Sequence, residues 1–262
     1  MAHLLQINNL WGGYHKETII KDVYLDINAG EFIGVIGPNG SGKTTLLRLA
    51  SRVLKPHRGR INLNGRDIAE MDLKEFCRKV AFVPQDTLVN FSFSVWEMVL
   101  MGRIPHLTRL QLETLKDFSI AESAMIMTAT LGLRDKRMDE LSAGERQQVV
   151  IAKALAQEPV LLFLDEPTAH LDIGHQVQIL DLLRKLNRKN NLTIVMVVHD
   201  LNLASEYCSR IVLLNEGKVY KDGLPQQVLT YQNIEAVYKT LVVVRDSPIN
   251  SKPYVILIPR EK

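Results

Sequence analysis

The chain has 262 residues, of which 46% are hydrophobic and 23% are charged, and its formal net charge is +3. This composition is ordinary for a soluble globular protein, and the length is sufficient for a large buried core in one large domain or one domain with a sizeable insertion. The 32 basic and 29 acidic residues form no long block of one sign. The charge therefore does not indicate nucleic-acid binding, and we expect no nucleic-acid partner.

The cysteines and the apolar runs bear on the compartment of the protein. Cys77 and Cys208 match neither a metal-binding nor a CxxC spacing, which favours a reduced cytosolic protein. The first residues lack the basic and apolar blocks of a signal peptide. The longest apolar runs, Val160–Leu164 and Ile194–Val198, are far shorter than the ~20 residues that span a bilayer. A role at a membrane would therefore require a membrane-embedded partner.

The first 85 residues predict mainly strands. Apolar residues alternate with polar ones in the first ~30 residues, most clearly over Ile19–Ile27, which favours antiparallel strands. A short apolar strand then leads through a glycine-rich turn into a helix expected over Thr44–Val53. The further strands expected in this part are Phe32–Ile36, Arg60–Leu63 and Val80–Val83.

The pattern changes to helical spacing from Trp96 to about Gln157, which predicts a helical insertion. Two fully apolar strands follow, Val160–Leu164 and Ile194–Val198, and the segment between them predicts an amphipathic helix. The order strand, helix, strand favours a buried parallel sheet and an α/β fold. The apolar stripe of that helix consists of Ile173, Val177, Leu180, Leu183 and Leu186.

The sequence Gly37-Pro-Asn-Gly-Ser-Gly-Lys-Thr44 matches the phosphate-binding P-loop, with a strand before it and a helix after it. Its backbone N–H groups and the helix N-terminus favour phosphate oxygens. We expect Lys43 to reach the β- and γ-phosphates and Thr44 to bind Mg²⁺. A glycine-rich turn with a chance lysine is disfavoured by the flanking elements. The residues expected to contact the nucleotide here are Gly37, Pro38, Asn39, Gly40, Ser41, Gly42, Lys43, Thr44 and Thr45.

Polar residues also follow the later apolar strands. Asp165 and Glu166 stand where ligands of open α/β sheets bind, so Asp165 would hold Mg²⁺ and Glu166 would orient or deprotonate water. By themselves they would suggest a loop start or a helix cap. His199 ends the next strand and would meet the γ-phosphate, unless it is a packed or capping residue. Gln85, after Val80–Val83, is uninformative individually.

The segment Leu141-Ser-Ala-Gly-Glu145 precedes a helical pattern and resembles a second anion-binding turn. One nucleotide needs only one P-loop, which suggests that this turn contacts a nucleotide bound by another chain. A plain helix N-cap at Ser142 remains the favoured interpretation of the stretch alone.

The whole set resembles the nucleotide-binding subunit of ATP-binding cassette (ABC) transporters, over roughly Leu4 to Gly223. The resemblance identifies the P-loop, the Asp165-Glu166 pair and the signature turn, whose residues Ser142, Ala143, Gly144 and Glu145 would contact ATP. It also implies a P-loop ATPase core with an antiparallel N-terminal part. It further implies that Tyr14 stacks on adenine, and that Gln85 is the Q-loop residue and contacts Mg²⁺. Asp172 would be the D-loop aspartate, and His199 would be the switch histidine.

The resemblance implies a head-to-tail homodimer with two ATP molecules at its interface, each between one P-loop and the other subunit's Ser142–Gly144 turn. The dimer would drive polytopic permease subunits, and indirectly serve a substrate-binding protein, from the cytoplasmic face of the inner membrane as a peripheral protein. It also implies one ABC ATPase domain over residues 1–262. Its core would be residues 1–85 and 158–262, and its helical signature subdomain residues 86–157.

Three segments are similar to importers for iron-siderophores, haem and cobalamin: Ser94–His106, Thr168–Ile173 and the tail Val242–Pro259. The usual signature is Leu-Ser-Gly-Gly-Gln, so Ala143 and Glu145 are departures. Ala143 would cost roughly 1 kcal/mol or more if the turn required positive φ. With negative φ the change should be mild, and we expect working ATPase sites.

Other classes of function remain as alternatives. An ABC ATPase acting on ribosomes or DNA usually carries two cassettes or long insertions, which this chain lacks. A small kinase would not need the 141–145 turn or His199, and a regulator without turnover would not need Glu166. An ABC subunit for a different cargo, including an exporter, also fits the motifs.

Overall fold

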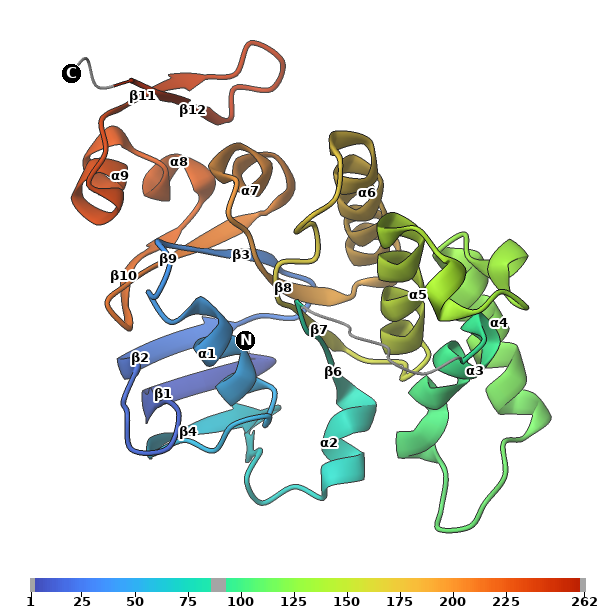
Figure 1. Cartoon of the computed structure of the whole chain (residues 1–262). Helices are drawn as coiled ribbons and strands as arrows, with labels where there is room; N and C mark the ends of the chain where they lie inside the picture. The colour runs from blue at the N-terminus through green and yellow to red at the C-terminus, as the bar shows by residue number, and fades with distance from the viewer. Residues whose placement is uncertain (1–2, 86–92, 260–262) are drawn as a thin grey trace. The chain divides into compact units, whose positions relative to one another are not determined.

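The structure, a computed structural model, describes residues 3–85 and 93–259 (Figure 1). The chain divides into two compact units, the first from Met1–Glu70 and Thr193–Lys262 and the second from Met71–Leu192. The helical subdomain expected over residues 86–157 falls within the range of the second unit, and its residues 86–92 lie outside the described residues. The boundaries expected at residues 85 and 158 therefore stay a prediction.

The first unit contains an antiparallel sheet in the order β2-β1-β4-β5. Leu5, Ile7 and Leu10 alternate with more exposed residues and are buried, so β1 has one core face. This sheet confirms the antiparallel strands predicted for the start of the chain. Its strands are β1 (Leu5–Gly12), β2 (Ile20–Ile27), β4 (Arg58–Leu63) and β5 (Arg66–Asp67).

A second sheet of this unit is mainly parallel. Strand β3 pairs in parallel with β8 and with β9, while β10 returns antiparallel to β9. Every residue of β3 and β8 is buried, which explains their continuous apolar sequences. The expected α/β fold is confirmed. These strands are β3 (Phe32–Ile36), β8 (Thr193–Val197), β9 (Arg210–Asn215) and β10 (Lys218–Gly223).

Helix α1 (Lys43–Ala50) follows β3 and ends earlier than the predicted Thr44–Val53. The chain leaves the helix because Arg52 adopts a left-handed conformation with φ 60°. The thiol of Cys208, which follows helix α7 (Leu201–Tyr207), packs on β3: a Cβ added to Gly34 would lie 2.8 Å from its Sγ. Burial raises the pKa of Cys208 to about 12.

The C-terminal hairpin of strands β11 and β12 is fastened to helix α7, over which it lies in Figure 1. The Asn202 side chain donates to Val255 O at 3.2 Å and accepts from Val255 N at 2.7 Å. Ser205 Oγ donates to Pro253 O at 2.7 Å. The elements of this part are α7 (Leu201–Tyr207), α8 (Pro225–Val228), α9 (Tyr231–Tyr238), β11 (Val242–Asp246) and β12 (Pro253–Leu257).

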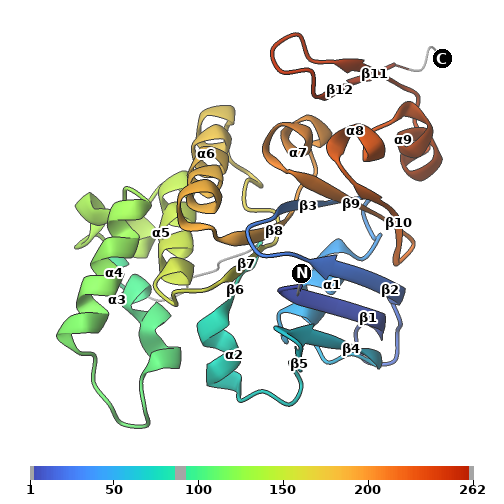
Figure 2. The same ribbon diagram turned by 180° about the vertical axis from the view of Figure 1, so that it is seen from behind.

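The second unit combines one pair of parallel strands, β6 and β7, with helices. Figure 2 shows α3, α4 and α5 grouped together, in agreement with their mutual contacts. The elements are α2 (Leu73–Lys79), β6 (Val80–Val83), α3 (Val95–Leu100), a 3-10 helix (Met101–His106), α4 (Leu115–Met127), two 3-10 turns (Leu131–Leu133 and Met138–Glu140), α5 (Ala143–Leu155), β7 (Leu161–Leu164) and α6 (Ile173–Asn190).

A buried arginine joins three parts of this unit. Arg103 is 2% exposed, and its guanidinium donates to Asp117 Oδ1 at 3.0 Å and to Ala156 O at 2.6 Å. It also pairs with Glu158 at 2.9 Å. A hydrogen bond from the Thr114 hydroxyl and the pairing with Arg103 hold the pKa of Asp117 down at about 2. The 3-10 helix is thereby tied to α4 and to the end of α5.

The apolar stripe predicted for α6 is only partly confirmed. Ile173 and Val177 are 80% and 39% exposed, so the prediction for these residues is wrong. The buried side chains of α6 are Ile179, Leu180, Leu183 and Leu186. The helix packs through its later turns, whereas its first turn is capped by Asp172 and presents its apolar side chains to solvent.

Candidate nucleotide site

The predicted P-loop connects β3 to α1 in the first unit. Gly37, Gly40 and Gly42 have φ values of 148°, 77° and 99°, which side chains disfavour. Gly37 also lacks space, because an added Cβ would lie 2.4 Å from Leu214 O. The loop conformation therefore requires glycine, and it delivers the N-terminus of α1, which begins at Lys43, to the sheet edge.

Two polar side chains of the loop are arranged for an anion. Lys43 is 6% exposed, and its Nζ donates to Gly37 O at 2.9 Å and Pro38 O at 3.0 Å. The lysine charge is thus held over its own loop. Ser41 is 2% exposed, and among the described residues its Oγ has no hydrogen-bond partner. A phosphate oxygen is a group that would satisfy this hydroxyl.

The loop is supported by residues that the sequence did not single out. Gly217 N, in the β9–β10 turn, donates to Ser41 O at 3.1 Å, and Lys21 N donates to Gly217 O at 2.8 Å. Burial raises the pKa of Tyr238 to about 12, against the effect of a hydrogen bond with the Gly37 backbone. Tyr238 lies some two hundred residues from Gly37 in the chain, and no local pattern marks it.

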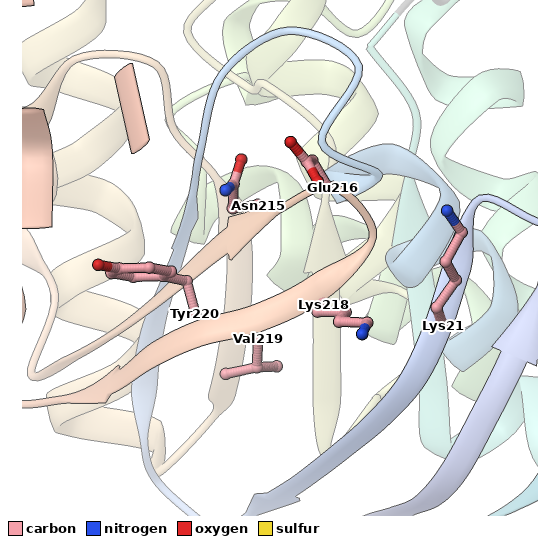
Figure 3. Close-up of a pocket in the computed structure, with 6 residues that line it drawn as sticks. All are labelled: Lys21, Asn215, Glu216, Lys218, Val219 and Tyr220. Carbon is pink, nitrogen blue, oxygen red and sulfur yellow. The ribbon is translucent and has the colours of Figure 1, made fainter. Parts of the chain in front are cut away.

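An open pocket of about 420 Å³ lies at the same β9–β10 turn (Figure 3). The side chains of Lys21 and Lys218 lie on one side of it and Tyr220 on the other. None of the predicted site residues lines this pocket, so it is distinct from the P-loop. Its lining residues are Lys21, Asn215, Glu216, Lys218, Val219 and Tyr220.

Tyr14 and His199 also belong to the first unit. Arg48 of α1 donates to the Tyr14 hydroxyl at 2.9 Å and lies 5.9 Å from its ring centroid, which fixes the ring beside the helix after the P-loop. His199 is exposed and follows β8. Because β8 is the parallel neighbour of β3, the C-terminal ends of both strands lie at one edge of the sheet, and His199 and the P-loop both follow that edge.

The second unit brings Gln85 and Glu166 together. Gln85 Nε2 donates to Glu166 Oε2 at 2.8 Å. This contact follows from the parallel pairing of Val83 with Leu164, which ends both strands at one edge. Glu166 has a φ of 52°, a conformation that is uncommon for a residue with a side chain.

Asp165 precedes this pair and is fully buried. Its N–H donates to Val83 O at 2.9 Å, which continues the strand pairing. No group of three or more His, Cys, Asp or Glu able to hold a metal occurs in residues 3–85 and 93–259. Mg²⁺ bound mainly by phosphates and water needs only one or two protein oxygens, so Thr44, Gln85 and Asp165 are chemically suited to it.

The signature turn forms a helix N-terminus. Ser142 caps α5: Glu145 N donates to Ser142 Oγ at 3.3 Å, and Ser142 N donates to the Glu145 carboxylate at 2.9 Å. These bonds hold the pKa of Glu145 below its usual range. Ala143 is a helical residue outside the positive-φ set, so the strain considered for it does not arise.

Asp172, predicted to act at the nucleotide, caps α6. Its carboxylate accepts from His175 N at 2.9 Å and lies 2.7 Å from His175 Nδ1. The predicted contact of Asp172 with ATP stays a prediction. Of the predicted site residues, the first unit holds the P-loop, Tyr14 and His199 at the end of β8, and the second brings Gln85 together with Glu166.

No helix in the part of the chain that the structure describes combines the length and apolarity that a bilayer span needs.

A family model described as ABC transporter matches residues 20–169. The uncharacterized ABC transporter ATP-binding protein YvrA of Bacillus subtilis (strain 168) is 40% identical over 258 residues. That match covers 98% of this chain, which spans only 58% of the length of YvrA.

Two further matches each cover nearly the full length of this chain and of the protein with which it is compared. The ferric enterobactin transport ATP-binding protein FepC of Escherichia coli (strain K12) is 38% identical over 248 residues, 95% of this chain and 92% of FepC. Among solved structures, an inward-facing ABC transporter described as of the metal-chelate type has a TM-score of 0.86 at 30% identity. That likeness covers 99% of this chain and 98% of the other.

Proposed function

Because the chain belongs to the ABC transporter family, we propose that it is the ATP-hydrolysing subunit of an importer for a metal chelate. The cargo class is that of iron-siderophores, haem or cobalamin. The observation that carries the cargo class is the likeness over 99% of this chain and 98% of a metal-chelate type transporter chain. FepC, whose name specifies ferric enterobactin transport, supports the same class.

The P-loop would bind the phosphates of ATP through its N–H groups and Lys43, beside the ring of Tyr14 for the adenine. Thr44, Asp165 and Gln85 are the residues suited to hold Mg²⁺, which would neutralise charge on the β- and γ-phosphates. Glu166, oriented by Gln85 at 2.8 Å, would accept the proton of the attacking water. His199 would donate a hydrogen bond to the γ-phosphate from the sheet edge of the P-loop.

The α5 N-terminus favours a dimer. Its first N–H groups and its positive dipole end suit an anion, and each chain has its own P-loop as well. In a head-to-tail homodimer, each signature turn would meet the ATP of the partner. ATP would then close the dimer, and hydrolysis would reopen it to move permease subunits at the cytoplasmic face of the inner membrane. A substrate-binding protein would deliver the chelate to the permease.

The test is co-purification of the tagged chain from detergent-solubilised membranes, with partners identified by mass spectrometry. We expect a polytopic membrane protein to co-purify. The Lys43→Ala variant is the matched control, because it should keep the partner and lose ATP hydrolysis by the purified complex. Recovery of ribosomal or DNA-repair proteins without a membrane protein would refute the importer.

The cargo class needs a second measurement on the same complex. We expect the permease complex in vesicles, with its binding protein, to take up a ferric siderophore, haem or cobalamin in an ATP-dependent manner. Uptake of an amino acid or sugar, and of none of these chelates, would replace the cargo class and leave the ATPase assignment intact.

A further inference from the structure

His175, in the first turn of α6, makes two contacts with the residue that caps this helix. Its backbone N–H donates to Asp172 Oδ1 at 2.9 Å, which any residue could provide. Its ring Nδ1 lies 2.7 Å from Asp172 Oδ2. A carboxylate accepts hydrogen bonds only, so Nδ1 carries the proton and the ring orientation is fixed. The ring contact is therefore additional to helix capping.

The other edge of the His175 ring lies against the signature turn. A Cβ added to Gly144 would lie 2.2 Å from His175 Cδ2 and 2.8 Å from Cγ. Separations below about 3 Å do not occur between such atoms, so the ring occupies the space that a side chain at position 144 would need. Gly144 is helical and has no positive φ, hence the close approach of the ring is what requires glycine here.

Glu145 connects the ring to the cap of α5. Its carboxylate accepts from Ser142 N at 2.9 Å and from Ser142 Oγ at 2.8 Å. Lys136 and the His175 ring both lie near enough to this carboxylate to contribute to the lowering of the pKa of Glu145. Asp172, His175, Gly144 and the Ser142–Glu145 cap thus form a continuous chain of contacts between the starts of α6 and α5.

We propose that His175 is a positioning residue that sets the signature turn for the partner's ATP by bridging Asp172 and Gly144. This inference rests on the proposed function, because it assumes that the Ser142–Gly144 turn serves a partner's nucleotide. Displacing such a turn by about 1 Å would cost up to about 100-fold in the step that depends on it. ATP binding to the P-loop of a single chain does not depend on the bridge.

Two substitutions test the contacts of the ring. His175→Ala removes both contacts. His175→Asn places an amide N–H where Nδ1 stands and an amide oxygen near the position of Cδ2, so it keeps the bond to Asp172 and the edge against Gly144. Gln178→Ala is the control, since Gln178 is exposed on the same helix. All three are made in the Glu166→Gln background, where ATP-bound dimers should accumulate and can be followed by sedimentation.

We expect His175→Ala to weaken ATP-driven dimerisation by about 10-fold or more, and His175→Asn to restore most of that loss. The affinity of the monomer for a fluorescent ATP analogue should be unchanged, and a merely unfolded or loosened protein would lose that affinity as well. Gln178→Ala should match its parent in both measurements. A loss in His175→Asn as large as in His175→Ala would refute a bridge through Nδ1 and Cδ2, and parental dimerisation in His175→Ala would refute the whole inference.

A second measurement tests the contact without reference to function. Gly144→Ala should lower Tm clearly in the wild type, because the new methyl overlaps the ring. In the His175→Ala background the same substitution should lower Tm much less. An equal loss in both backgrounds would refute the contact. Absence of ATP-driven dimers in the Glu166→Gln parent would instead count against the proposed homodimer, so the two failures are distinguishable.

Discussion

The two units hold the polar groups of the candidate site in place in different ways. In the first, the P-loop depends on backbone: three glycines with positive φ, and a lysine held by carbonyl oxygens at 2.9 and 3.0 Å. In the second, side chains hold one another, as in Gln85 with Glu166 and Asp172 with His175. A backbone site is specified by a short run of residue types, whereas a side-chain site is specified by packing between distant segments.

This difference implies different responses to substitution. A substitution in the Gln85–Glu166 or Asp172–His175 pair can remove one function and leave the fold, because both of these bonds involve exposed or half-buried groups. A side chain added at Gly37 should disturb the loop itself, because this position stands against the backbone oxygen of Leu214. The following substitutions test that contrast, from the largest expected effect to the smallest.

Glu166→Gln should lower kcat for ATP by about 10²–10⁴-fold, because the amide cannot accept the proton of the attacking water. ATP should still bind, and the dimer should remain closed. Steady-state turnover and sedimentation with ATP measure both effects. Glu216→Gln is the control, since Glu216 is an exposed glutamate with a similar φ of 49°. Unchanged turnover in Glu166→Gln would refute its role as the general base.

Gly37→Ala should destabilise the first unit by about 3 kcal/mol or more, by adding steric overlap to an unfavourable φ. The overlap is with Leu214 O, 2.4 Å from the new Cβ. Gly65→Ala is the matched control, because Gly65 has a φ of 79° and open space around its Cβ position. Urea unfolding should show a much larger loss for Gly37. Equal losses would mean that only the backbone angle matters.

Asp117→Ala should lower the free energy of unfolding by about 1.5–3 kcal/mol, because it removes charge-assisted bonds to the buried Arg103. The pKa of Asp117 is depressed to about 2, so the ionised form stabilises the fold above the unfolded pKa of about 4. That stability is lost as pH falls from about 4 to about 2. The difference between wild type and variant in urea unfolding should therefore shrink over this range.

Ala143→Gly, which restores the more common signature residue, should have the smallest effect. Ala143 has helical geometry, so glycine there gains nothing and costs at most about 1 kcal/mol. We expect ATP turnover within about 2-fold of wild type, an energy difference below about 0.5 kcal/mol. A 10-fold rise in turnover would show that the methyl of Ala143 obstructs the bound state.

The sequence predicted most of what depends on short segments. The strand before the P-loop and the helix after it were found because Phe32–Ile36 is wholly apolar and Gly37–Thr44 follows a fixed pattern. The capping role of Ser142, left open beside an anion-binding role, is the one that the structure displays. The end of α1 was missed because the left-handed turn at Arg52 has no residue preference that marks it.

Contacts between distant segments could not be predicted. Tyr238 reaches the Gly37 backbone from α9, and nothing near either residue signals it. The same holds for His175 against Gly144, since a lone histidine among seven carries no spacing pattern. Ile173 was assigned to the core because its spacing fits the stripe of α6. Its exposure of 80% shows the limit of periodicity. The spacing predicts which face of a helix is apolar, but not which turns of that face pack against the rest of the protein.

The burial of Cys208 means that a thiol reagent can label the folded native chain at a single other cysteine. The Cys208 thiol packs on Gly34, and a pKa of about 12 leaves almost no thiolate near neutral pH. Cys77, the other cysteine, is half-buried on α2 and therefore partly accessible. A maleimide dye should attach at Cys77 alone while the protein stays folded. A reporter of changes in the second unit is thus available without engineering a cysteine.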